Sequence, residues 1–300
     1  MQIRSLAGLL LLTKKPQTMN QRLLPYWLIA PATLFTVALF VVPFYGVASL
    51  AFTGSNGGFS LAAFQQMSQH WKFGAALQNT LWLAVLVIPL QLVLALAMAQ
   101  MLSQIRKGRD LLLYVWTVPL GISDLAAGII WLAIFEQTGF LNSVLVSLGA
   151  ASEPFNFLAF QNTGTLLLAV VLAEVWRATA IVLVILVSGM GLIPKEYGEA
   201  ADVFGASAWQ KFRHVTLPLL KPSLQTALIL RTILAFEVFA VVAALSGTKF
   251  PVLMSETYNW QFNLQDGPVA AAMAMVILGV SIVSTLIYLR VLRTPPGAST

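Results

Sequence analysis

The segment from Ile193 to Pro222, IPKEYGEAADVFGASAWQKFRHVTLPLLKP, is the one long polar interruption in a largely apolar chain of 300 residues. Pro194 suits the first turn of a helix, where a missing N–H costs nothing, and acidic residues follow near the positive end of the helix dipole. Gly205 has the freedom to end this helix, Ser207 can cap a second one, and Pro218 is expected to stop it. The segment therefore predicts a helix, a turn and a second helix at a membrane surface.

The composition places the rest of the chain in a membrane. Hydrophobic residues make up 58% and charged residues only 9% of the sequence, whereas a soluble domain usually has about 25% charged residues. The net charge of +6 does not indicate nucleic-acid binding, because Lys and Arg are scattered among apolar segments. No cysteine is present, which excludes disulfide and thiolate chemistry.

Six apolar segments are long enough to cross about 30 Å of hydrocarbon, which takes about 20 residues. They run over residues 26–50, 77–102, 111–135, 165–189, 224–245 and 269–289. Residues 141–148 are too few to cross and are predicted to form a helix at the outer surface. The predicted fold is an all-α bundle of about six transmembrane helices. It comprises a tail or interfacial helix over 1–24, a transmembrane domain over 25–292 and a tail over 293–300.

The start of the chain has two interpretations. The apolar run over residues 5–12 is too short to span a membrane, and no small-residue cleavage site follows it. We expect a tail rather than a signal peptide, with Met19 as an alternative initiator.

The basic residues predict the orientation. On the side of the polar segment lie Arg4, Lys14, Lys15, Arg22, Arg106, Lys107, Arg109, Lys195, Lys211, Arg213, Lys221, Arg290 and Arg293, and on the other only Lys72 and Lys249. The positive-inside rule then places both termini and the polar segment in the cytoplasm. His70 and His214 fall on opposite sides, so no two-histidine metal site is expected.

Five ionisable residues fall inside the apolar segments: Asp124, Glu174, Arg177, Arg231 and Glu237. Each costs about 2.5 to 3.5 kcal/mol at the centre of a membrane, so each needs a role or a partner. Glu174 and Arg177 are three residues apart and predict an ion pair, either structural or lining a path. Arg231 and Glu237 lie about 240° apart around a helix and need separate partners. Asp124, which follows Pro119 and Gly121, could accept from freed backbone N–H groups.

The polar segment resembles a known family. Glu199-Ala200-Ala201, followed by Gly205 and Leu217-Pro218, is similar to the EAA coupling loop of permease subunits of ATP-binding-cassette importers. Further family-like strings are Asn79-Thr80, Ala127-Gly128-Ile129-Ile130-Trp131, Glu174-Val175-Trp176-Arg177 and Leu230-Arg231-Thr232. The resemblance covers about residues 25–292 and is greatest to sugar permeases of the maltose and trehalose type. The alternative is an amphipathic interfacial hairpin without a partner.

The resemblance implies two sets of site residues. The set that would dock on a cytoplasmic ATPase is Glu196, Glu199, Ala200, Ala201, Asp202, Gly205, Ala206, Leu217 and Pro218. The set that would line the substrate path is Glu237 with Phe236 and Phe239, together with Arg231, Trp176 and Asn79.

The resemblance also implies partners. These are a second, different permease chain, two ATP-hydrolysing subunits, an external solute-binding protein and membrane lipid. The chain lacks the GxxxxGK[ST], HExxH and GxSxG motifs, so no catalytic activity is expected and ATP and magnesium would bind the partner. The alternatives are a glycerol phosphate ester as substrate, or a secondary transporter with Glu174, Glu237 or Asp124 as the ion-coupling carboxylate.

Overall fold

The structure is a computed structural model that describes residues 19–54, 56–105 and 107–292. The chain divides into two units, Met1–Leu50 and Ala51–Thr300. Apart from an isolated bridge between Thr53 and Phe59, the regular structure of the described residues is helical, and the predicted all-α class is confirmed. Most of the two predicted tails, residues 1–18 and 293–300, lies outside the described residues.

The first unit is built on one apolar helical stretch. It consists of α2 (Met19–Thr36), a π-helical turn η1 (Val37–Val41) and α3 (Val42–Phe52), whose last residues belong to the second unit. Residues Leu23–Phe52 are long and apolar enough to cross a membrane. This stretch contains the first predicted span.

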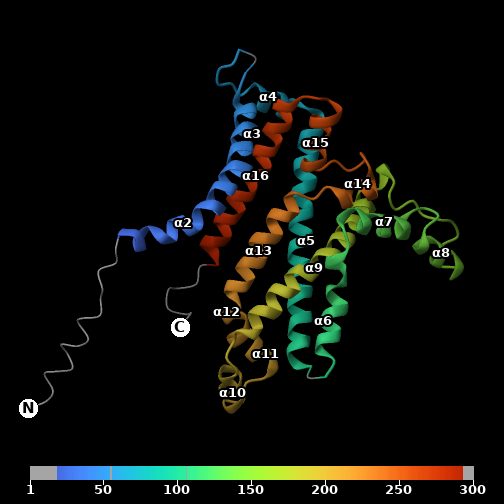
Figure 1. Cartoon of the computed structure of the whole chain (residues 1–300). Coiled ribbons are helices and arrows are strands. Elements are labelled where there is room, and N and C mark those ends of the chain that lie inside the picture. The colour runs from blue at the N-terminus through green and yellow to red at the C-terminus, as the bar shows by residue number, and fades with distance from the viewer. Residues whose placement is uncertain (1–18, 55, 106, 293–300) are drawn as a thin grey trace, which may run out of the picture. The chain divides into compact units, whose positions relative to one another are not determined.

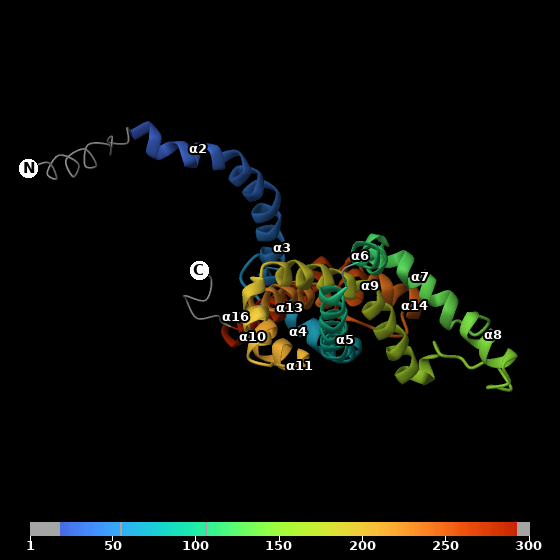
Figure 2. The ribbon, with the colours of Figure 1, turned by 90° about the horizontal axis from the view of Figure 1, so that it is seen from below.

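The second unit is organised around three packed helices, α5 (Trp71–Gln104), α9 (Thr163–Gly191) and α13 (Lys221–Phe236). Figures 1 and 2 show them together, with α16 (Gly267–Val291) beside α13. At the end of this unit opposite α10 (Lys195–Val203), α4 (Ala62–Gln69) packs against α16. At the same end α15 (Leu253–Tyr258) packs against both α5 and α16. Small residues allow close packing, since a Cβ on Gly189 of α9 would lie 2.1 Å from Ser223 Oγ of α13.

The third predicted span, residues 111–135, is not one helix. It consists of α6 (Arg109–Thr117), a 3-10 turn η2 (Val118–Gly121) and α7 (Asp124–Phe135). Pro119 lies in the 3-10 turn, and Ser123 caps the new helix by accepting a hydrogen bond from Ala126 N at 3.2 Å. The predicted short helix is α8 (Phe140–Ser147), which continues from α7, and together they form an apolar stretch of 24 residues.

The fifth predicted span, residues 224–245, is also broken. The helix α13 ends at Phe236, and α14 (Ala240–Ser246) begins after Glu237, Val238 and Phe239. The two helices pack in different places, since Phe236 joins a cluster with α5, α15 and α16 while Val238 and Val241 join one with α7 and α9. Tertiary packing breaks this helix where no proline or glycine marks a break.

The described residues contain five helical stretches that could cross a membrane, and a sixth if Ala208–Leu219 and Lys221–Phe236, bent by 67°, form one span. The bend lies at Leu220, so the second helix of the loop ends at Leu219, one residue after Pro218, which was expected to stop it. Pro218 lies in α12 (Leu217–Leu219), the last residues of the helix that begins at Ala208. Five to six candidate spans within this range agree with the predicted number of about six.

Candidate functional site

The predicted helix, turn and second helix lie together at one end of the second unit, where Figure 1 labels α10 and α11 (Ala208–Lys211). The first helix, α10 (Lys195–Val203), has Pro194 as its N-cap, one position before the expected one. At its other end Gly205 has φ +72°. Gly205 N donates to Asp202 O at 2.9 Å, and Ala206 N donates to Ala201 O at 3.0 Å. This is a Schellman motif, whose left-handed position favours glycine.

The second helix begins with a complete capping box. Ser207 Oγ accepts from Gln210 N at 3.3 Å, and Gln210 Oε1 accepts from Ser207 N at 2.7 Å. The helix continues through α11 (Ala208–Lys211), a π-helical turn η4 (Phe212–Thr216) and α12. Lys211 Nζ lies 2.7 Å from Asp202 Oδ1. One ion pair therefore joins the second helix to α10.

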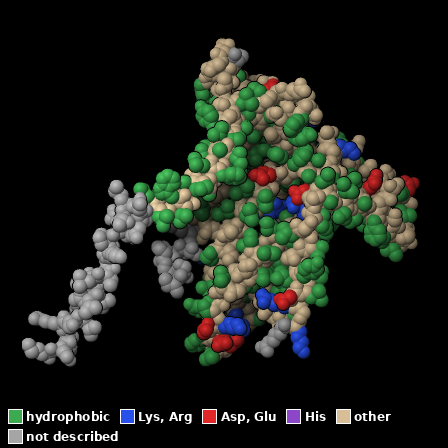
Figure 3. Space-filling model, viewed as in Figure 1, with side chains coloured by type: hydrophobic (Ala, Val, Ile, Leu, Met, Phe, Trp, Pro, Cys, Tyr) green, Lys and Arg blue, Asp and Glu red, His purple; other side chains and the backbone are tan. Residues whose placement is uncertain are grey.

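This loop exposes large apolar side chains among charged ones. Phe204 is 89% and Val203 is 86% exposed, and Trp209 is 63% exposed. Figure 3 shows acidic and basic side chains gathered at the same end of the molecule. Of the residues in the predicted coupling set, Glu196, Glu199, Ala200, Asp202, Gly205 and Pro218 are exposed, and Ala201, Ala206 and Leu217 are half-buried. Contiguous exposed apolar surface is typical of a protein-docking site.

A buried polar network joins the three central helices. Glu174 and Arg231 are each 2% exposed and form an ion pair at 2.7 Å between α9 and α13. Arg231 Nε also donates to Gln91 Oε1 of α5 at 2.6 Å. Gln91 Nε2 in turn donates to the backbone oxygen of Glu174 at 2.8 Å. Arg231, which the sequence analysis assigned to the substrate path, is therefore buried between the central helices.

The network continues toward a more open region through Arg177. Its distance to Glu174 Oε2 is 3.4 Å, whereas its distance to Asp124 Oδ1 is 2.7 Å. The side chain of Arg177 is 18% exposed and that of Asp124 is 51% exposed. Glu174 and Arg177 thus lie within ion-pair distance, but each has a closer partner on another helix. Asp124 pairs with an arginine rather than with the backbone groups that its sequence position suggested.

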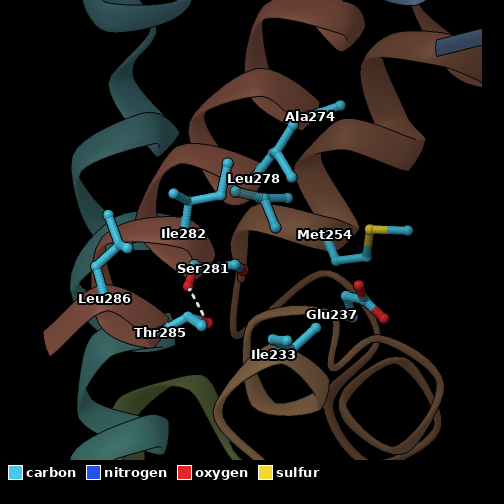
Figure 4. A pocket seen from close by; sticks show the side chains of 10 residues that line it. Ile233, Glu237, Met254, Ala274, Leu278, Ser281, Ile282, Thr285 and Leu286 are labelled. Atoms are coloured by element: carbon cyan, nitrogen blue, oxygen red, sulfur yellow. Dashed lines mark hydrogen bonds between the residues drawn. The ribbon is translucent and has the colours of Figure 1, made fainter. Parts of the chain in front are cut away.

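Glu237 lies at a separate pocket of about 420 Å³ between α13, α15 and α16. Figure 4 shows Glu237 and Met254 on one side of this pocket and the α16 residues Leu278 and Ile282 on the other. The lining is mostly apolar, with the hydroxyls of Ser281 and Thr285 as further polar groups. The carboxylate is exposed and has no ion pair among the described residues.

The other residues predicted for the substrate path are not brought together at this pocket. Phe236 is buried in the core, and Phe239 stacks on Tyr258 at 5.2 Å between ring centroids. Trp176 contacts Trp131 edge to face at 6.1 Å. Asn79 Nδ2 donates to Pro251 O at 2.9 Å and holds the segment before α15. Only Glu237 of this predicted set lines the pocket.

Sequence reasoning missed Gln91, which completes the buried network. It is 0% exposed, and both the oxygen and the nitrogen of its side-chain amide are hydrogen-bonded. A glutamine amid the apolar residues of α5 was the available signal, because a buried amide requires partners. No metal-binding group of three His, Cys, Asp or Glu side chains occurs among the described residues.

The helical arrangement is found in known transport proteins. A bacterial ABC transporter that imports the acidic polysaccharide alginate has a chain that superimposes with a TM-score of 0.78 at 21% identity, over 91% of this chain and 96% of that one. Residues 91–294 match the family described as "Binding-protein-dependent transport system inner membrane component". This chain belongs to that family. It is therefore a permease of an ABC importer and a multi-pass protein of the inner membrane.

Two named relatives of this permease belong to carbohydrate transport systems. The trehalose/maltose transport system permease protein MalF of Thermococcus litoralis is 32% identical over 214 residues, 69% of this chain and 70% of that protein. The arabinooligosaccharides transport system permease protein AraP of Bacillus subtilis is 30% identical over 286 residues, 90% of this chain and 89% of that protein. The family lacks catalytic activity, and a separate chain hydrolyses ATP.

Proposed function

We propose that this permease carries a carbohydrate, a disaccharide or oligosaccharide, across the inner membrane. The membrane domain is assigned to residues 25–292, with a cytoplasmic tail on either side. The complex would contain a second, different permease, two ATP-hydrolysing subunits that bind ATP and magnesium, and an external solute-binding protein. Sugar transport by the relatives MalF and AraP supports the substrate class.

The observation that supports the mechanism is the exposed apolar surface on the polar segment between α9 and α13, here named the α10–α11 loop. Phe204 and Val203 are nearly fully exposed on a helix whose end is fixed by a Schellman motif. A rigid helix with exposed apolar groups can transmit a push from an ATPase subunit into α9 and α13, between which the loop lies. The loop is proposed as the lever, because it is continuous with two of the three central helices.

Glu237 is proposed to contact the substrate. Its carboxylate is exposed beside a pocket, whereas Glu174 is buried and paired. Phe239 and Tyr258 form a stacked aromatic pair next to it along the chain. A carboxylate that accepts hydroxyl hydrogen bonds near aromatic rings suits a sugar better than a phosphate ester, which the carboxylate would repel. A phosphate ester remains the alternative substrate, and an ion-coupled mechanism is not supported for a member of this family.

The proposed orientation can be tested with fusions. A reporter active only outside the cytoplasm should be active after Asn56, Gly149 or Gly247, and silent after Gly108 or Ala206, because basic residues concentrate on the latter side. Enzymatic activity of each fusion in intact cells is the measurement. The opposite pattern would place the α10–α11 loop outside and remove it from any cytoplasmic ATPase.

Substitution of Glu237 tests the proposed path. Glu237→Gln should leave the complex assembled and weaken uptake, with altered selectivity among maltose, trehalose and arabinobiose, because hydrogen bonding changes while shape does not. Uptake of each labelled sugar into proteoliposomes that contain the whole importer is the measurement.

Glu153 provides a matched control for Glu237. It is also exposed but does not line the Glu237 pocket, so Glu153→Gln should leave uptake unchanged. A Glu237→Gln complex that fails to assemble would assign this carboxylate a structural role. An assembled complex with unchanged uptake and selectivity would remove it from the path.

A further inference from the structure

A second pocket lies at the base of the α10–α11 loop, apart from the Glu237 pocket. It has a volume of about 440 Å³ and is formed by the C-terminal ends of α5 and α9 together with α10, α11 and η4. The α10–α11 loop forms one of its walls. A molecule bound in this pocket would therefore contact both central helices and the proposed coupling loop.

Each polar side chain that lines this pocket is able to donate a hydrogen bond, and none is a carboxylate. They are Gln100, Ser103 and Gln104 of α5, Lys195 of α10, Lys211 of α11 and Thr216 of η4. Lys195 has no ion pair among the described residues. Such a set of donors with two ammonium groups is suited to an anion with several acceptor oxygens.

Two further features favour a phosphoryl group. Lys195 is the first residue of the nine-residue helix α10, so the positive end of the helix dipole also lies at the pocket. Met190, Ile193 and Val215 provide an apolar wall, which can pack against the carbon skeleton of a phosphate ester. Basic pockets between helices at a membrane face are typical binding sites for phosphate-bearing head groups.

We propose that this pocket binds a phosphoryl group through Lys195 and Lys211. The group is carried either by a soluble phosphate compound or by an anionic lipid head group. Lys211 also forms the ion pair with Asp202 that joins α11 to α10, so the bound group shares this ammonium with the coupling loop. A bound phosphate or lipid head group would thus contact the coupling loop at a site apart from the proposed sugar path.

A thiol reporter can test this site because the chain has no cysteine. Ala208 is exposed on the pocket wall, and Ala208→Cys places a single thiol there. The assembled importer is placed in phosphatidylcholine nanodiscs, and the rate at which N-ethylmaleimide alkylates this chain is measured. At a ligand concentration about ten times Kd, the rate should fall about tenfold.

Two arms distinguish the sources of the phosphoryl group. In the first, inorganic phosphate replaces chloride at equal ionic strength in the neutral nanodiscs. In the second, phosphatidylglycerol replaces part of the phosphatidylcholine, and no phosphate is added. Slower alkylation in the first arm indicates a soluble phosphate compound, and slower alkylation only in the second indicates a lipid head group.

Charge variants test whether protection of the thiol from alkylation arises from binding in this pocket. Lys195→Gln should abolish protection, whereas Arg213→Gln, which removes the same charge from an exposed position outside the pocket, should retain it. Asp202→Asn frees Lys211 and should lower the ligand concentration needed. Unchanged alkylation in both arms, or protection that survives Lys195→Gln, would overturn the proposal. Val215→Cys is the second reporter if the Ala208 variant does not assemble.

Discussion

Glu174→Gln is expected to lower the amount of assembled permease strongly. The substitution leaves Arg231, which is 2% exposed, without the carboxylate that lies 2.7 Å away. Removing one partner of a buried ion pair costs about 3 to 5 kcal/mol in soluble proteins, because the remaining charge is stranded. This is a large part of the stability of a typical domain. The measurement is the yield of monodisperse complex after purification, together with its melting temperature.

A second substitution should distinguish the two arginines near Glu174. Arg231→Gln in the Glu174→Gln background removes the stranded charge and should restore part of the yield. Arg177→Gln in the same background should restore less, because Arg177 retains Asp124 at 2.7 Å and is 18% exposed. Equal rescue by both would show that the two arginines share Glu174 evenly. Normal assembly of Glu174→Gln with loss of uptake alone would make Glu174 a path residue.

These two arginines also show where sequence reasoning stopped. Glu174 and Arg177 lie on one helix, so their separation of three residues predicts their closeness. Arg231 is 57 residues from Glu174, and Gln91 is 83 residues away on the other side. Periodicity and spacing do not give the packing of α5, α9 and α13 against one another. The pair was therefore predictable, whereas the network required the fold.

The broken helices show the same limit. Pro119 and Gly121 mark the interruption in the third predicted span, although the apolar length of residues 111–135 concealed it. No local signal marks the break at Glu237, because it results from tertiary packing: α13 packs against α5, α9 and α16, whereas α14 packs against α7 and α9. The pocket beside Glu237 consequently depends on a helix break that the sequence alone does not reveal.

The capping residues of the α10–α11 loop were better predicted because their chemistry is local. Gly205 and Ser207 were expected at the end of one helix and the start of the next, and the Schellman motif and capping box place them there. Pro218 was expected to stop the second helix, which ends one residue later, at Leu219. The direction of the chain after it depends on the packing of Leu220, which is 0% exposed.

Gly205→Val is expected to uncouple sugar uptake from ATP hydrolysis. Gly205 has φ +72°, and a Cβ at this position would meet no atom within 4 Å. The penalty therefore comes from the backbone alone, at about 1 to 2 kcal/mol for an L-residue. A change of this size alters the population of the native loop about five- to thirtyfold. The complex should still assemble and hydrolyse ATP, while uptake per ATP in proteoliposomes falls.

Gly149 allows backbone strain to be separated from position. It has φ +70° and equally open space around its Cβ position, but it follows α8, far along the chain from the coupling loop. Gly149→Val should carry the same strain and leave uptake per ATP unchanged. Gly205→Asn should retain most coupling, because asparagine tolerates the left-handed region better than other residues. If Gly205→Val transported normally, or if Gly149→Val uncoupled equally, the α10–α11 loop would not be the lever.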